Sequence, residues 1–227
     1  MKQYKRFVLI VSMMAFSILA CQVGGLGGST TISGSGNVVA NEYDLAGFDA
    51  VDISHSFKVV VTQGESYSVI VRVDDNLVEH LNVVKQGSTL KIGLKPNLDY
   101  TIRNATMEAE VTMPELTGVE ASGSSDATIT GFESTNALQV DLSGASTAVL
   151  TGSAGEVTVD ASGSSEADLA EFPIGDARVD ASGVSTVTVN VSGRLDADAS
   201  GSSEVLYIGN PTLGTIETSG SSSVEPK

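Results

Sequence analysis

The sequence predicts an all-β protein, a right-handed parallel β-helix with about 20 residues per turn, and three observations support this. From Val119 onward, a seven-residue phrase centred on Ser-Gly returns six times. Apolar and polar residues alternate on both sides of each phrase, which is the period of a β-strand. Charged residues make up only 18% of the chain and apolar residues 41%, so the chain can bury a core despite its net charge of −16.

The first 20 residues are predicted to be a signal peptide. Lys2, Lys5 and Arg6 precede an uncharged run over residues 7–20, which is too short to span a bilayer comfortably. The run ends Leu-Ala-Cys21, the pattern of a bacterial lipobox, so we expect Cys21 to carry a lipid and residues 21–31 to form a flexible tether. The alternative is an ordinary secretion signal followed by a spare thiol. Either reading places the mature chain outside the cytoplasm, and the first anchors it to the cell envelope.

Each repeated phrase predicts a strand, a tight Ser-Gly bend and a second strand. Spacings of 18 to 21 residues separate the central glycines, which are Gly123, Gly144, Gly163, Gly183, Gly201 and Gly220. A period near 20 residues indicates turns stacked along one axis. We expect the glycine to take a positive φ or to allow adjacent turns to approach closely. A second bend and a short third side would complete each turn.

Small apolar residues four before and four after each glycine are expected to stack inside the coil. The first column contains Val119, Val140, Val159, Val179, Ala197 and Ile216, and the second contains Ala127, Ala148, Ala167, Val187, Val205 and Val224. A serine column lies two residues after the glycine and contains Ser125, Ser146, Ser165, Ser185, Ser203 and Ser222. These hydroxyls are expected to bond to neighbouring backbone and to the same serine one turn away.

Two columns of polar residues differ in how they place negative charge. Three residues after the glycine, acids alternate with hydroxyls in the column Asp126, Thr147, Glu166, Thr186, Glu204 and Ser223. Three residues before the glycine, every position is acidic, in the column Glu120, Asp141, Asp160, Asp180, Asp198 and Glu217. Carboxylates on adjacent turns, about 4.8 Å apart, would repel by about 0.9 kcal/mol in bulk water.

Two explanations for the uninterrupted acidic column stay open. It could bind divalent cations such as calcium, which favour carboxylate oxygens, or a partner molecule. Alternatively, each acid accepts hydrogen bonds from serine hydroxyls or backbone N–H groups, or points into solvent. The chain lacks the glycine-aspartate repeat of calcium-binding β-helices, so we favour the second explanation and expect no cofactor.

Residues 32–117 lack the tight period but still predict strands, at residues 57–62 and 67–73, and a hairpin over residues 82–92. A single helical turn is expected near residues 76–81. Residues 51–57 resemble the repeat, with Asp52 in the acidic column and His55 where glycine would stand. We therefore expect one domain over residues 32–227, in which irregular first turns (32–117) cover the open edge of the regular repeats (118–227).

Several function classes are disfavoured by composition. An acidic surface repels nucleic acid, and a single cysteine forms neither a disulfide framework nor a thiolate zinc cluster. Some parallel β-helices cleave polysaccharides with paired carboxylates, but a catalytic pair should interrupt the pattern locally, whereas these acids recur on every turn. His55 and His80 are the only histidines and are expected to be satisfied bend or surface residues.

Six segments in order resemble the family of auto-transporter adhesin "head GIN" domains of bacterial envelope proteins. They are residues 33–38 (SGSGNV), 48–54 (FDAVDIS), 59–64 (VVVTQG), 74–77 (DDNL), 90–94 (LKIGL) and 113–123 (MPELTGVEASG). The resemblance implies a β-helical extracytoplasmic domain, often lipid-anchored, for which no activity is established. We expect a non-catalytic lipoprotein whose acidic face binds envelope glycan or another protein. The alternatives are a polysaccharide lyase or hydrolase and a passive spacer.

Overall fold

The computed structural model describes residues 30–96 and 99–227. Its larger compact unit comprises Ile32–Pro96 and Ile102–Lys227, and this unit is described by itself below. Strands β1 (Thr30–Ser33) and β8 (Tyr100–Arg103) form a separate two-stranded sheet. The predicted signal peptide and Cys21 lie outside the described residues.

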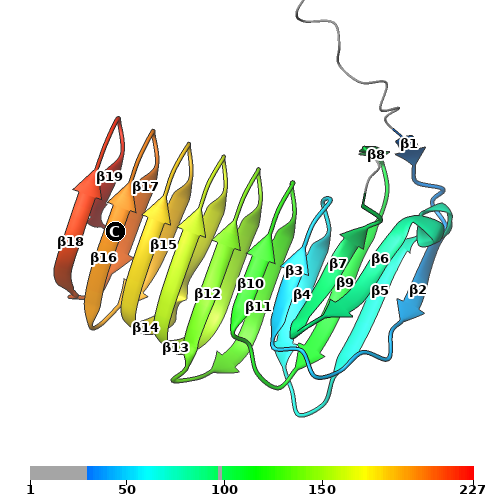
Figure 1. Cartoon of the computed structure of the whole chain (residues 1–227), viewed down its shortest axis with the longest axis horizontal. Helices are drawn as coiled ribbons and strands as arrows, with labels where there is room; N and C mark the ends of the chain where they lie inside the picture. Colours follow the sequence, from blue (N-terminus) through cyan, green and yellow to red (C-terminus); the bar gives the residue numbers. More distant parts are fainter. Residues whose placement is uncertain (1–29, 97–98) are drawn as a thin grey trace, which may run out of the picture. The chain divides into compact units, whose positions relative to one another are not determined.

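The repeats form a β-solenoid of about five turns, as predicted, in which the chain alternates between two rows of parallel strands (Figure 1). The first row, which we call the acidic face, contains β10 (Gly118–Ala121), β12 (Ala137–Leu142), the second halves of β13 (Thr147–Ala161) and β14 (Glu166–Ala181), β16 (Arg194–Ala199) and β18 (Thr212–Thr218). The second row, the alternating face, contains β11 (Asp126–Glu133), the first halves of β13 and β14, β15 (Thr186–Val191), β17 (Glu204–Ile208) and β19 (Ser223–Pro226).

Both predicted inward columns are confirmed. Val119, Val140 and Val159 pair in consecutive turns and are at most 2% exposed. The column of Ala127, Ala148 and Ala167 is equally buried on the alternating face. Small side chains suit these positions because the two faces pack directly against each other. In the last described turn Ile216 and Val224 are partly exposed, because only one neighbouring strand packs on each.

The Ser-Gly turns explain why glycine recurs. All six central glycines have φ between 75° and 78°, a conformation that costs other L-residues free energy. Each turn also stacks closely on the one before it: Ser164 donates its N–H to the carbonyl of Gly144 at 2.7 Å, and Val184 does the same to Gly163 at 2.7 Å. Both expectations for the glycine, positive φ and close approach, are therefore confirmed.

The buried serine column bonds to backbone and not to itself. Ser203 Oγ lies 2.9 Å from the carbonyl oxygen of Ser200 in its own turn and 3.0 Å from that of Ala181 in the preceding turn. Ser146 and Ser185 repeat this arrangement. The prediction of backbone acceptors is confirmed and that of serine-to-serine bonds is wrong, because both carbonyls lie within reach of the single hydroxyl proton.

The N-terminal part continues the solenoid and then reverses. Parallel strands β3 (Ala50–Ile53) and β4 (Lys58–Gln63) pair with β10 and β11 and form the first turn. Beyond them lie parallel β7 (Thr89–Leu94) and β9 (Met107–Met113). Three further strands form antiparallel pairs. β2 (Val38–Glu42) pairs with β5 (Ser68–Asp74), β5 pairs with β9, and β6 (Leu81–Gln86) pairs with β7.

The antiparallel pairing differs from the further turns that we expected. A tight turn with Gly87 at φ 63° joins β6 to β7, so the chain folds back on itself where a parallel connection would need a longer crossover. The predicted helical turn is the 3-10 helix η1 (Asp75–His80), which buries Leu77 at this end of the solenoid (Figure 1). This end is therefore covered, as expected.

The predicted third side of each turn is not a separate strand in β13 and β14, which run on through the second bend. Bending within a strand is possible because Gly152, at φ 141°, adopts a conformation that other residues avoid. Backbone pairing continues through the bend, where Ala154 lies opposite Ile174 and both side chains are buried.

Among residues 30–96 and 99–227, no helix is both long and apolar enough to cross a membrane.

The substitution Gly163→Val tests the turn. A β-carbon there would stand 2.5 Å from the carbonyl oxygen of Gly144, on a backbone with φ 78°. We expect the free energy of unfolding, measured by urea titration, to fall by more than the roughly 1 kcal/mol of an average substitution. Ser164→Val is the matched control, because the next turn carries Val184 at the equivalent, exposed position. Equal losses in the two variants would contradict the stacked-turn explanation.

Candidate functional site

The acidic column forms one unbroken row along the acidic face. The six carboxylates, which we call the carboxylate ladder, pair in consecutive turns in the order Glu120, Asp141, Asp160, Asp180, Asp198 and Glu217. Asp52 extends the row by one turn, as the sequence predicted, and Lys91 follows Asp52 on β7. The structure thus brings every predicted ladder residue together, because each strand of this face enters in the same register.

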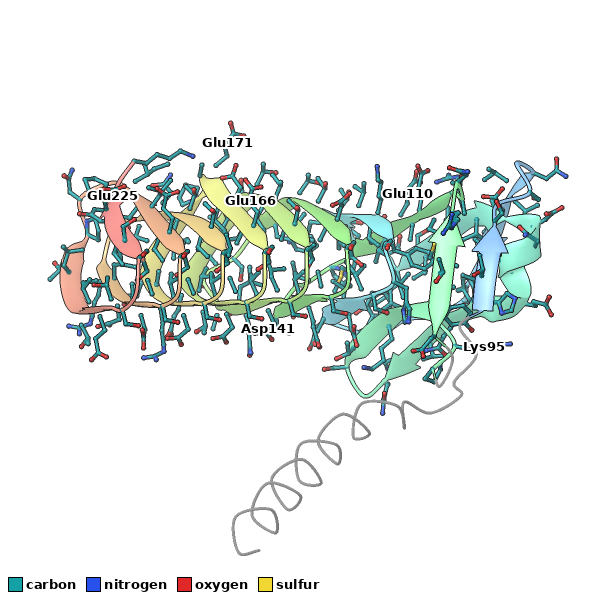
Figure 2. The ribbon with its side chains drawn as sticks, turned by 90° about the horizontal axis from the view of Figure 1, so that it is seen from above. Lys95, Glu110, Asp141, Glu166, Glu171 and Glu225 are labelled. Carbon is teal, nitrogen blue, oxygen red and sulfur yellow. The ribbon has the colours of Figure 1, made fainter. Side chains whose placement is uncertain are left out.

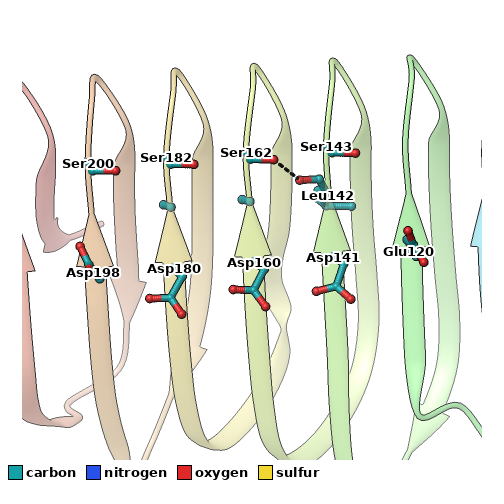
Figure 3. Close-up of a pocket in the computed structure, with 12 residues that line it drawn as sticks. Glu120, Asp141, Leu142, Ser143, Asp160, Ser162, Asp180, Ser182, Asp198 and Ser200 are labelled. Atoms are coloured by element: carbon teal, nitrogen blue, oxygen red, sulfur yellow. Dashed lines mark hydrogen bonds between the residues drawn. The ribbon is translucent and has the colours of Figure 1, made fainter.

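The ladder lines an elongated groove of about 390 Å³. Figure 3 shows five of its carboxylates side by side, with the serines that precede each glycine above them. The groove residues that carry polar side chains are Glu120, Asp141, Asp160, Asp180, Asp198, Ser143, Ser162, Ser182 and Ser200. Ser162 donates to the carbonyl of Leu142 at 3.3 Å and not to a carboxylate. The groove therefore presents carboxylate and hydroxyl oxygens together along one line.

Side chains two residues earlier on the same strand are the partners of two ladder acids. Gln139 donates to Asp141 at 3.0 Å, and Arg178 contacts Asp180 at 3.2 Å. At the N-terminal end, Lys91 forms a 2.6 Å ion pair with Asp52. None of these three partners was predicted from the sequence. The two-residue period of a strand could have predicted Gln139 and Arg178, because residues two apart lie on the same face. Lys91 could not have been predicted in this way, because it reaches Asp52 only through the pairing of β7 with β3.

Two acids of the ladder, Asp160 and Glu120, have raised pKa values. Burial, followed by the negative charges of Asp141 and Asp180, raises the pKa of Asp160. The pKa of Glu120 is also raised, by burial and then by the charge of Asp52, and Lys91 offsets only part of this rise. Burial and neighbouring carboxylates therefore oppose the ionisation of these two acids.

No three Asp, Glu, His or Cys side chains converge on one point suited to a metal ion within the described ranges. The ladder places its acids in a single file, whereas calcium takes six or more oxygen ligands around it.

The alternating face handles charge differently. One row of residues in register crosses its strands and continues into the N-terminal part, in the order Arg72, Glu108, Lys58, Asp126, Thr147, Glu166, Thr186, Glu204 and Ser223. The predicted alternation of acid and hydroxyl thus continues into the N-terminal part as an alternation of acid and base. Figure 2 shows Asp141 on one long face and Glu110 and Glu166 on the opposite one. The same fold therefore separates like charges on one face and lines them up on the other.

Two carboxyls outside the ladder are held in the charged form. Asp74 is 1% exposed and accepts N–H groups from Thr106 at 2.6 Å and Gly36 at 2.5 Å, which lower its pKa. Asp196 accepts from Arg194 and from the Thr215 N–H, each at 2.6 Å, and its pKa falls to about 2. These groups stabilise the fold when ionised, in contrast to Asp160 and Glu120.

Neutralising one rung of the ladder should stabilise the protein. We expect Asp160→Asn to raise the free energy of unfolding by up to about 1 kcal/mol at low salt, because it removes repulsion from both neighbours. Glu166→Gln is the control, since its neighbours in register are Thr147 and Thr186. Thermal unfolding at low and high salt measures both, and the gain should shrink as salt screens the ladder. An equal gain in the control would contradict this account.

Stability should pass through a maximum at mildly acidic pH. As the pH rises from about 2 to about 4, Asp196 and Asp74 ionise in the folded state before they do in the unfolded chain, so stability increases. As the pH rises further, Glu120 and Asp160 keep their protons longer in the folded state, because their pKa values are raised, so stability falls. Urea unfolding between pH 2 and pH 8 measures this curve. A rise that continues to pH 8 would contradict it.

Comparisons with known proteins agree with the fold. Residues 47–211 match the family model described as "Putative auto-transporter adhesin, head GIN domain". A "putative adhesin" from Bacteroides fragilis is similar in structure, with a TM-score of 0.71 and 20% identity over 86% of this chain and 100% of that one.

Two further solved structures share the fold. A "putative lipid binding protein" from Parabacteroides distasonis has a TM-score of 0.62 and 20% identity, covering 87% of this chain and 100% of its own. A "putative adhesin" from Parabacteroides merdae has a TM-score of 0.52 and 16% identity, covering 88% and 100%. No curated protein matches this chain. The family model covers residues 47–211, well over half of the sequence, and the chain therefore belongs to the head GIN domain family of adhesin-like proteins.

Proposed function

We propose that this protein is a lipid-anchored, adhesin-like module of the bacterial cell envelope that binds a partner along its carboxylate ladder. The observation that carries the proposal is the contrast between the two faces. In the row on the alternating face, each acid is separated from the next by a hydroxyl or a base. On the acidic face, six acids lie in consecutive turns, and five of them line a groove. A feature that costs stability and is repeated turn after turn favours a binding role.

The chemistry of the groove favours a partner with hydrogen-bond donors or positive charge. Its carboxylates accept hydrogen bonds, and its serine hydroxyls can donate as well as accept. Envelope glycan, rich in hydroxyl groups, and a protein with basic side chains both fit this surface. Repetition of the same groups on each turn suits an extended partner better than a compact small molecule.

The ladder itself is proposed to act by binding and not by catalysis. Its acids recur in equivalent surroundings, whereas a glycoside-cleaving pair needs two carboxyls with different environments and roles. Family membership points the same way, since the family is described as adhesin-like.

The anchor is the second part of the proposal. Basic residues, an uncharged run and Cys21 at its end support attachment through a lipid on Cys21. Cys21→Ser should abolish incorporation of radiolabelled palmitate and move the protein from the membrane fraction to the soluble fraction. Retention of the label would contradict lipidation at this residue.

Binding is tested by a glycan array and a pull-down from envelope extract, each with calcium and with a chelator. The ladder variant carries Asp141→Asn, Asp160→Asn and Asp180→Asn, and the matched control removes three acids from the other face through Asp126→Asn, Glu166→Gln and Glu204→Gln. We expect the ladder variant to lose at least about tenfold in affinity, equivalent to about 1.4 kcal/mol, and the control to bind normally. Equal binding by the two variants, or no binding by the wild type, would overturn the proposal and favour a spacer.

A further inference from the structure

One turn of the solenoid departs from the repeated pattern, and it lies where the carboxylate ladder begins. In the described turns from β10 to β19, a glycine always follows the first serine. In the turn between β3 and β4, Ser54 is followed by His55 instead. His55 keeps the glycine-like backbone, with φ 63°. Non-glycine residues in this region are strained by about 1–2 kcal/mol, and such strain gathers at functional sites. The exchange of glycine for histidine is therefore a local interruption of the kind that a reactive site requires.

The histidine side chain contacts the hydroxyl next to it. Ser54 Oγ lies 2.7 Å from His55 Nδ1, and the Leu94 N–H donates to the same nitrogen at 3.4 Å. Since an N–H can donate only to an unprotonated nitrogen, Nδ1 is the acceptor and the ring proton lies on Nε2. The hydroxyl of Ser54 therefore donates its proton toward a basic nitrogen, the arrangement that activates a serine nucleophile.

The surroundings hold this pair in place. Gly93 on β7 lies beside Ser54, and a β-carbon there would overlap with Ser54 Oγ and crowd His55 Nδ1. Burial lowers the pKa of His55 and the charge of Asp52 partly offsets this, so the net shift favours the neutral ring, which can accept a proton. Asp52 also favours the imidazolium that would form, while its own charge is balanced by Lys91 at 2.6 Å.

We propose that Ser54 is a base-activated nucleophile that accepts an acyl group from an ester. Ser54 Oγ attacks the carbonyl carbon while its proton passes to His55 Nδ1. The bond from that carbon to the leaving oxygen then breaks, and the leaving alkoxide takes the proton from His55. The products are an ester on Ser54 and a free alcohol. Lys91 balances the charge of Asp52 but not that of Glu120 on the next turn, which disfavours anions, so the ester is uncharged or cationic.

A fluorophosphonate probe tests the proposal, because an activated serine displaces its fluoride and keeps the phosphonyl group. After incubation of the full chain, peptide mass spectrometry should find the adduct on Ser54. Ser122 and Ser143 are internal controls, since they occupy the same position in the next two turns, where glycine follows. Labelling of Ser54 no faster than of these two serines would overturn the proposal.

The variant His55→Gly separates activation from folding. Glycine adopts the positive φ of this position in the other turns, so the variant should fold, which thermal unfolding checks. We expect its labelling rate at Ser54 to fall by about a hundredfold, the range of a general base. In the wild type the rate should rise with pH as His55 loses its proton, on the acid side of the ordinary histidine range, and in the variant this rise should vanish. An unchanged rate in the variant would show that the pair has only a structural role. Partner binding along the ladder is measured separately, so either proposal can fail alone.

Discussion

Parallel backbone pairing between successive Ser-Gly turns is the constraint on which the rest of this structure depends. Each glycine takes a positive φ, and from Gly144 onward the residue after it donates to the glycine carbonyl of the turn before. A side chain at this position would meet that carbonyl. The turn therefore fixes the register, and the register places equivalent residues of every repeat in line. Buried serines strengthen this arrangement by joining carbonyls of adjacent turns.

Because the register is fixed, the order of charged residues in the sequence determines which charges lie side by side on each face. Because equivalent residues lie one strand spacing apart, about 4.8 Å, the choice of residue at a single repeat position decides the charge of a whole face. The alternating face keeps like charges apart, while the acidic face brings them together. Burial, with these neighbouring charges, raises the pKa of Asp160 and Glu120. A coil that stacks small side chains tolerates this cost because its stability is a sum over many equivalent contacts between turns.

The carboxylate ladder and the Ser54–His55 pair lie in different parts of the solenoid. The ladder repeats one chemical group along a groove and suits an extended partner. The Ser54–His55 pair occurs in one turn, at the boundary between the regular repeats and the antiparallel strands.

The sequence by itself determined the solenoid, the inward columns and the membership of the carboxylate ladder, because a 20-residue period leaves one way to align the repeats. It also placed Asp52 in the ladder and His55 at the glycine position. Only the tertiary structure decided the pairing of β7 with β3 that brings Lys91 to Asp52, and the antiparallel strands that cover one end. These depend on contacts between segments that share no period, so nothing local in residues 32–117 specifies which strands become neighbours. The partners of the serine hydroxyls were decided in the same way, by carbonyl positions that exist only after the turns have closed.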